Sequence, residues 1–418
     1  MHRFAMSVLT VCAVLVAASA SAQTKTEEPG ELDLPRVIAL AAEQSPAARI
    51  GRTQVAEAEG RLTGADVRSL DNPTVGAALG PRIGSRNGLD VDLTLEVPVE
   101  LGGRRTKRVS AAAAGLAREK HRVDDLRREA IATAVRAYYR ALRAEESVRL
   151  AQEQKRLAEE LLGAAQARYE AGQVPRLEVN LAYAQVARAG SHIATEQVGA
   201  ARTKAELALA LGLPSTGNLR PVGELRDRSV LDSAGSVAAP EDRADVLAAL
   251  SDVRAAEAEA ALAEAERLPE LAFTAGYARE EDANVLLAGV SLSLPLFNPH
   301  KGAVLEAEAR KQRARVEAET RRVVASAQVE GAREAYGGAL EAVRLIEAET
   351  LPRAFENEKL TLESYRAGKI GLPTLLQVRR EVLEARRAYL DTLLEAAEAG
   401  TDLVSALGSF PTRTNPTR

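Results

Sequence analysis

Few side chains that could carry out chemistry remain in this sequence once its first segment, which ends at Ala22, is set aside. The histidines beyond it are His121, His192 and His300, and no two of them stand at the i and i+4 spacing of a helical metal site. No serine has a Gly-x-Ser-x-Gly setting, and no glycine-rich loop follows a strand in the manner of a phosphate-binding site. The sequence therefore predicts no enzyme active site, no cofactor and no metal centre, and each histidine is expected to be packed or solvated.

The chain begins like a secretory protein. Arg3 precedes an apolar run from Val8 to Ala18, and Ala20-Ser21-Ala22 fits an A-x-A cleavage site, so residues 1–22 are expected to be a signal peptide. A lipoprotein signal at Cys12 is the alternative, and the apolar run that continues past this cysteine disfavours it. Removal of the signal leaves no cysteine and no methionine, so packing rather than disulfides must stabilise the mature chain.

The composition excludes several classes of protein. The formal net charge is -4 and 27% of residues are charged, with the two signs intermixed, which argues against a nucleic-acid-binding surface and is typical of long solvated helices. No segment beyond the signal has the roughly 18 consecutive apolar residues of a membrane-spanning helix. If the mature chain enters a membrane, it must do so as β-strands in a closed barrel.

Candidate functional carboxylates lie on a predicted strand from Asp90 to Val99. Apolar side chains alternate there with Asp90, Asp92 and Glu96, and such alternation over about ten residues is typical of a barrel strand with a lipid side and a water side. An amphipathic strand of a soluble sheet is the alternative. In a symmetric barrel the three carboxylates would form acidic rings that favour cations, unless they are simply wetted residues of the lumen.

Very long helices must position these strands. No proline interrupts the segment from Arg104 to Glu170, and at about 1.5 Å per residue this predicts a helix of roughly 100 Å, which must lie against other long helices. The other elements expected are helices at 32–70, 176–211, 245–267, 302–366 with a kink at Pro352, and from 373 to 408, helix tips near 171–175 and 367–372, and strands at 74–80, 271–278 and 285–296.

The same order of elements occurs twice. Pro73 matches Pro269 and Tyr169 matches Tyr365, and the two pairs have the same separation along the chain. Such constant spacing predicts a duplication. The expected organisation is a signal at 1–22, a first repeat at 23–215, a linker at 216–240, a second repeat at 241–408 and a tail at 409–418.

Four strands from one chain cannot close into a barrel, so the chain is expected to assemble. Two chains would give eight strands and a barrel filled by side chains, whereas three chains would give twelve strands and an aqueous lumen. The predicted fold is mainly α with a small β part: a duplicated unit of helix, two strands and long helical hairpin. If three copies assemble, they would form a 12-stranded barrel, and the long helices would continue it as an α-helical tunnel away from the membrane.

Several motifs resemble those of the TolC-like outer-membrane efflux factors over essentially the whole mature chain. They include Ala167-Arg168-Tyr169-Glu170-Ala171-Gly172, Leu351-Pro352, Tyr365-Arg366-Ala367-Gly368 and Arg243-Ala244-Asp245, the last with alanine where the family has proline. The strand-to-helix junction at Glu100, Gly102, Gly103 and Arg104 resembles the form common in the heavy-metal cation branch of the family. Its counterpart, 297–302, has the general family form.

The resemblance implies a homotrimeric channel-tunnel in the outer membrane of a Gram-negative bacterium, with an adaptor protein and an inner-membrane RND-type pump as partners. Ile370-Gly371-Leu372 resembles the tip motif at which adaptors dock, although Pro373 replaces a small polar residue. The candidate docking residues at the two tips are Gly172, Val174, Gly368, Ile370, Gly371 and Leu372. Arg176, Glu178 and Lys369 are candidate ties between helices that hold the entrance shut, with ordinary surface charge as the alternative.

The function predicted from the sequence is thus a passive exit duct of a tripartite efflux system, with heavy-metal cations as cargo. The same duct for organic drugs or for a secreted polypeptide is an alternative. A periplasmic coiled-coil scaffold is a more remote one, which the alternating strands disfavour.

Overall fold

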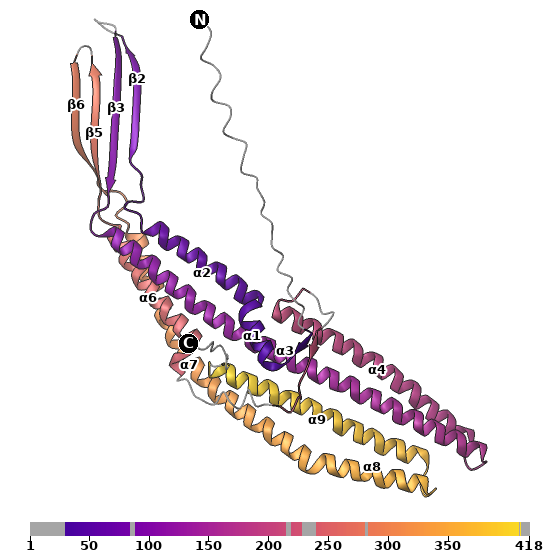
Figure 1. The fold of residues 1–418 in the computed structure, drawn as a ribbon. Coiled ribbons are helices and arrows are strands. Elements are labelled where there is room, and N and C mark those ends of the chain that lie inside the picture. The colour runs from indigo at the N-terminus through magenta and orange to yellow at the C-terminus, as the bar shows by residue number, and fades with distance from the viewer. Residues whose placement is uncertain are drawn as a thin grey trace, which may run out of the picture.

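The structure is a computed structural model, and it describes residues 30–83, 88–214, 219–227, 240–280, 283–408 and 410. The expected signal peptide and Cys12 lie outside the described residues, as does most of the tail. A four-stranded sheet stands at one end of the molecule, and two long helical hairpins extend from it to the other end (Figure 1). None of the helices in the described part of the chain combines the length and the apolar character needed to cross a membrane.

The first repeat contains the longest helix. Helix α3 runs from Arg104 to Glu170 and returns as α4, Arg176–Leu211. Glycine ends both helices, because Gly172 and Gly212 each have φ 70°, a left-handed conformation that L side chains avoid. The amide of Gln173 donates to the Arg168 carbonyl at 2.9 Å and so satisfies one of the last carbonyls of α3.

The expected single helix at 32–70 is wrong. Two helices occur, α1 (Leu34–Gln44) and α2 (Pro46–Ala65), and they are separated at Ser45. A residue before proline avoids the helical region, and Ser45 has an extended ψ of 149°. Its hydroxyl accepts a bond from the Ala48 amide at 3.2 Å, which caps α2. The Ser45-Pro46 pair therefore ends helix α1 and begins helix α2.

The second repeat contains α6 (Ala244–Ala265), α7 (Lys301–Leu345), α8 (Leu351–Arg366) and α9 (Leu372–Ala406). The expected kink at Pro352 is replaced by a π-helical segment, Ile346–Thr350, directly before α8. The Leu351 amide there donates to the Ile346 carbonyl, five residues back. Because Pro352 has no N–H to donate, the turn before it widens rather than bends sharply.

Both strand pairs lie in one antiparallel sheet with the order β2-β3-β5-β6, formed by Thr74–Arg82, Gly88–Val99, Glu270–Glu280 and Ala283–Ser293. The central pairing joins the two repeats, since Leu95 lies opposite Ala275. Strand β6 ends at Ser293, short of the predicted Leu296. Strands β2 and β6 are the edges of this sheet, and each has one paired side.

A short segment, 219–227, straps the middle of the molecule, although its composition predicts no regular structure there. Its strand β4 (Arg220–Pro221) pairs in parallel with β1 (Glu31–Leu32). The Tyr138 hydroxyl on α3 donates to the Val222 carbonyl at 2.7 Å, and burial, with Asp33 and Asp227 nearby, raises the pKa of this phenol. The hydroxyl therefore remains a donor at neutral pH.

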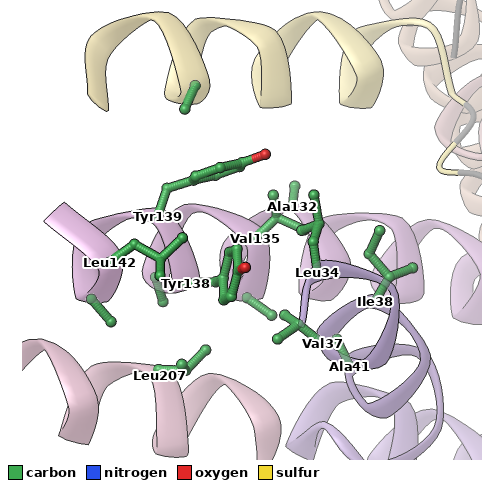
Figure 2. Close-up of a cluster of buried hydrophobic side chains, with 14 of the residues drawn as sticks. Leu34, Val37, Ile38, Ala41, Ala132, Val135, Tyr138, Tyr139, Leu142 and Leu207 are labelled. Atoms are coloured by element: carbon green, nitrogen blue, oxygen red, sulfur yellow. The ribbon is translucent and has the colours of Figure 1, made fainter. Parts of the chain in front are cut away.

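The largest apolar core lies beside this strap. Figure 2 shows side chains of α1, α3 and α4 meeting there, with Tyr138, Val135, Val37 and Leu207 among them. Ala396, Ala397 and other residues of α9 complete the cluster. The core therefore fixes the hairpins of both repeats against each other at mid-height.

Candidate functional site

One face of the sheet is apolar and exposed. Pairing across the strands puts alternate residues of all four on this face, where Leu95 lies opposite Val75 and Phe273 lies opposite Val290. Leu286 is 82% exposed and Val75 is 76% exposed, so the described chain leaves them open. The other large exposed side chains of this face are Leu79, Leu89, Leu93, Leu95, Phe273, Val290 and Leu292.

The opposite face of the sheet is mostly polar or small. Asp90, Asp92 and Glu96 all lie on it, because they alternate with the apolar residues of β3. The Thr94 hydroxyl lies above Gly76, where an added Cβ would come within 2.6 Å of it. Thr274 is placed in the same way over Gly289. The glycines therefore make room for hydroxyls and keep this face open.

The two faces have different requirements. A continuous apolar patch of this kind is unstable in water and calls for lipid or another apolar surface. The open sides of β2 and β6 carry unpaired N–H and C=O groups, which call for further strands. The polar face needs water. The single chain therefore leaves both the apolar face and the two open edges of this sheet unsatisfied.

Two glycines form the turn between the sheet and α3. Gly102 and Gly103 have φ 65° and 71°, and a Cβ on Gly102 would overlap Leu268 of the second repeat. In the other repeat, His300 occupies the corresponding position before α7 and has φ 55°, the one positive φ found outside glycine in the described chain. His300 is therefore the turn residue of the second repeat.

Arginines at the start of α3 hold the junction together. The Arg104 guanidinium donates to the carbonyls of Ala265 and Glu266 at 3.1 and 3.2 Å and also to that of Leu268, which caps the end of α6. Arg108 caps α2 in the same way through the Ala65 carbonyl at 3.0 Å. One segment of α3 therefore fixes the ends of both helices that lead into the sheet.

Glu100 orients Arg108. It accepts a bond from the Arg108 guanidinium and another, at 3.2 Å, from the Leu70 amide. Both side chains of this pair are largely buried. The roles of Glu100, Gly102, Gly103 and Arg104 in the turn were visible as a motif, whereas the role of Arg108 was missed. An arginine four residues after Arg104, on the same helical face, was the available signal.

The tips of the two hairpins pack on each other. Tyr365, Leu372 and Leu375 of the second repeat are buried against Leu161 and Ala182 of the first. The Arg168 guanidinium lies 5.1 Å from the centre of the Tyr365 ring, a cation–π distance. The two tips are therefore one packed unit.

The predicted tip residues differ in their accessibility. Gly172, Val174, Gly368, Ile370 and Gly371 all lie at the exposed or partly exposed ends. Leu372 is fully buried in the tip cluster, so its proposed role as a docking residue is corrected to one of supporting the tip from beneath.

The three candidate ties are not brought together. Glu178 accepts a bond of 3.5 Å from the Tyr365 hydroxyl and so bridges the two hairpins. Arg176 and Lys369 are exposed, and no ion pair involves either of them within the described residues. Tyr365 was not among the residues that the sequence suggested near Glu178.

Ion pairs join α3 to α9 along the seam between the repeats. Arg136 pairs with Asp402 and Arg140 with Glu398, both at 2.6 Å. At the start of α6 the buried Arg243 contacts both oxygens of Asp245, and it also donates a hydrogen bond to the Ala406 carbonyl of α9 at 3.2 Å. Burial favours the neutral acid, yet Arg243 holds the pKa of Asp245 below its ordinary value.

A duplicated unit with a two-faced sheet on long helical hairpins defines the subunit of an outer-membrane channel-tunnel. The chain belongs to the outer membrane efflux protein family, which it matches at residues 40–213 and again at 236–409. The second match is displaced from the first by the same amount at both ends, and this displacement equals the spacing of the repeat in the sequence. The family resemblance is confirmed, and the protein is an outer-membrane efflux protein whose helices form a periplasmic tunnel.

Individual relatives are distant in sequence. The cobalt-zinc-cadmium resistance protein CzcC of Cupriavidus metallidurans is 24% identical over 327 residues, which are 75% of this chain and 76% of that protein. A membrane protein from Pseudomonas aeruginosa has a similar structure, with a TM-score of 0.75, 19% identity and 92% of each chain covered. CusC gives a TM-score of 0.71 at 17% identity over 90% of this chain and 92% of its own.

Proposed function

We propose that three copies of this chain close into a twelve-stranded barrel and act as the passive exit duct of a tripartite efflux system. The observation that carries the proposal is the sheet, which exposes a complete apolar face and two unpaired edges in the single chain. Strand β6 of one copy would pair with β2 of the next, so that every edge is satisfied. The apolar face would meet lipid and the polar face would line the lumen.

Three copies fit the polar face better than two. An eight-stranded barrel has an interior just wide enough to be filled by side chains, whereas twelve strands leave room for water. Asp92, Thr94 and Glu96 point to a wetted interior, and the glycines beside the threonines keep it wide. In the trimer Asp90, Asp92 and Glu96 would become threefold acidic rings that attract cations.

Heavy-metal cations are the proposed cargo. The similarity to CzcC, a cobalt-zinc-cadmium resistance protein, supports this choice, and so do the acidic rings. No group of three or more His, Cys, Asp or Glu side chains within the described residues has the arrangement of a metal site. The chain would therefore conduct the cations without binding them tightly. Organic compounds or a polypeptide as cargo would be the alternative.

The tips are the proposed contact with a periplasmic adaptor, which would connect the duct to an inner-membrane pump. Val174 and Ile370 lie at the two tips and are only partly buried, and Gly371, which follows Ile370, is exposed. Leu372 would support this surface from below. Arg176, Glu178 and Lys369 would hold the entrance shut through neighbouring copies or through the tip bridge to Tyr365.

Paired variants on neighbouring residues of β3 test the channel. Leu93→Asp places a charge on the apolar face, whereas Thr94→Asp places the same charge on the polar face. We expect Leu93→Asp to abolish insertion into outer membranes, because it places a charge against lipid, and Thr94→Asp to insert and form an oligomer of three chains. The measurement is native mass of the detergent-purified protein together with membrane fractionation. Equal insertion of both variants would disprove the proposed orientation of the sheet.

A deletion strain tests the cargo. Growth on zinc, cobalt, cadmium, copper and silver salts is compared for cells that lack the chain and cells that carry it. We expect cells that lack the chain to be more sensitive to at least one metal, and we expect the intact gene to restore their resistance. Unchanged metal sensitivity with increased sensitivity to organic compounds would assign the duct to organic cargo.

A further inference from the structure

A groove runs along the lower half of the molecule, with α3 as its floor and with α4 and α9 as its walls. It encloses about 290 Å³ and lies between the strap and the tips. The floor is made of small and apolar side chains such as Ala151 and Ala158. The charged side chains of the groove lie on its walls, and most of them are positively charged.

Four guanidinium groups line the walls, and Glu384 is the one carboxylate among the lining residues. Arg379 is turned away into the helix packing, where it donates to the Leu157 carbonyl at 3.3 Å and pairs with Glu358 at 3.5 Å. Burial lowers the pKa of Arg379, although Glu358 opposes that effect. The Arg379 guanidinium therefore has a structural role and is not counted among the groups that could bind a ligand.

Of the remaining three arginines, Arg387 is partly engaged, whereas Arg188 and Arg380 are open to solvent or ligand. Arg387 lies 3.0 Å from the nearer nitrogen of His192, and Glu196 lies 3.9 Å from Arg387. Arg188 on α4 and Arg380 on α9 are exposed, and within the described chain neither has an ion pair. The groove therefore has a surplus of positive charge even after Glu384 and Glu196 are counted.

This groove lies on the side of the helical wall opposite to the strap. The Tyr389 hydroxyl donates to Glu347 at 2.6 Å, and the other oxygen of Glu347 accepts a bond of 2.9 Å from Arg226 of the strap. Arg380 precedes Tyr389 by about two and a half helical turns, so the two side chains leave α9 on opposite faces.

The strap determines which face is the inner one. If three chains form a tube, a strap on the inner wall would place three copies of 219–227, together with β1, across the passage at mid-height. On the outer wall the strap leaves the passage clear. The groove then lines the inner wall near the entrance, and three copies bring six exposed arginines, two from each chain, to this part of the tunnel.

We propose that this groove is an anion-binding strip on the inner wall of the tunnel, and that it takes compact oxyanions with two or more negative charges, such as phosphate. The inference rests on the proposed trimeric duct. Guanidinium groups match the geometry of phosphate and carboxylate oxygens, and a narrow passage focuses their field. Anions are therefore concentrated at this level, and a metal cation passes it in the company of anions. The acidic face of the sheet lies at the other end of the path.

The test is ion selectivity of the purified full-length mature trimer in planar bilayers. Reversal potentials in a potassium chloride gradient are compared for the natural protein, for Arg188→Gln with Arg380→Gln, and for Arg149→Gln with Arg386→Gln. The last pair removes the same charge from a cavity on the strap side of the wall, which Tyr389 also lines. Inorganic phosphate on the entrance side serves as the ligand probe.

We expect the groove variant to lower the chloride-to-potassium permeability ratio about twofold or more and to weaken phosphate block, while the control variant leaves both unchanged. Equal effects of the two double variants, or no effect of either, would disprove the proposal that the groove binds anions on the inner wall. These results require a conducting trimer, so they leave the proposed duct intact. If the protein forms no trimer and no conducting pore, both proposals are disproved: the trimeric duct and the anion-binding strip.

Discussion

Gly103 and His300 occupy the same position in the two repeats, and both have a left-handed backbone. Each directly precedes a long helix, and their φ angles are 71° and 55°. The turn from sheet to helix therefore demands this conformation twice. The first repeat satisfies it with glycine, and the second does so with a residue that bears the strain.

We predict that His300→Gly stabilises the protein by about 1 kcal/mol, because a non-glycine residue in this conformation costs about 1–2 kcal/mol. Gly103→Ala should destabilise it by a similar amount. Gly302→Ala is the matched control, since Gly302 lies within α7 with open space around it and should gain from the better helix former. Thermal unfolding followed by circular dichroism measures all three. Destabilisation by His300→Gly would show that the imidazole has a role of its own.

The Arg104 cap gives a second prediction. Arg104→Lys keeps the charge but cannot reach several carbonyls at the end of α6 at once, so we expect a loss of about 1–3 kcal/mol. Arg105→Lys is the control, because the Arg105 side chain is 49% exposed and its partners at the end of α2 are wetted. Denaturant unfolding measures the loss of unfolding free energy for each of the two variants. Equal losses would mean that charge alone, rather than the planar guanidinium, holds the junction.

At the tips, the two neighbouring residues Gly371 and Leu372 should respond differently. Gly371→Lys should leave the fold intact, since φ is −84° and an added Cβ would meet only Pro373 at 3.5 Å, and it should abolish export by blocking the proposed adaptor contact. Leu372→Ala should cost about 2–5 kcal/mol, because it opens a cavity in the tip cluster. Thermal stability of the trimer and metal resistance of cells measure the two effects. Normal resistance with Gly371→Lys would disprove the docking assignment.

Acid should act through Asp245. Its pKa is lowered in the folded protein, so its contribution to stability is complete above the ordinary value of 3.8 and is lost as the pH falls through the lower folded value. Asp245→Asn should therefore destabilise the protein at neutral pH and flatten the acid limb of its stability profile. Unfolding free energies between pH 7 and pH 2 provide the measurement.

Asp252 should behave in the opposite way. Burial raises its pKa despite the nearby Arg122 and Arg118, so the folded state gains stability as the pH falls through the raised value. Asp252→Asn should remove this gain and leave the Asp245 effect in place. An acid limb that both substitutions change in the same direction would contradict the assignment of the two groups.

Local patterns predicted much of this molecule. Alternation on β3, the absence of proline in α3 and glycine at the tips each act over a few residues, so the sequence reveals them directly. The break at Ser45 is also local, but it becomes visible only when the serine hydroxyl and the following proline are considered together. The prediction missed this break, whereas the alternation, the long helix and the tip glycines agree with the structure because they depend on neighbouring residues alone.

Distant contacts decided the rest. The pairing of β3 with β5, the strap across Tyr138 and the cap that Arg104 supplies to α6 each join segments that lie far apart in the chain. No periodicity in the chain encodes such partners. The charge of the groove was hidden for the same reason, since Arg188 and Arg380 come from different repeats and meet only when α4 and α9 flank α3.

The pairing of β3 with β5 also affects the order in which the parts of the chain fold. Val91 in the first repeat pairs with Arg279 in the second, so the first hairpin of the sheet has to wait for the second repeat to arrive before its inner edge is covered. Contacts between such distant residues form slowly, and exposed apolar strands invite aggregation meanwhile. The helices, whose contacts are mostly local, can form early. The membrane-facing part of the protein is therefore the last part to mature, and its first hairpin is the segment that most needs protection on the way.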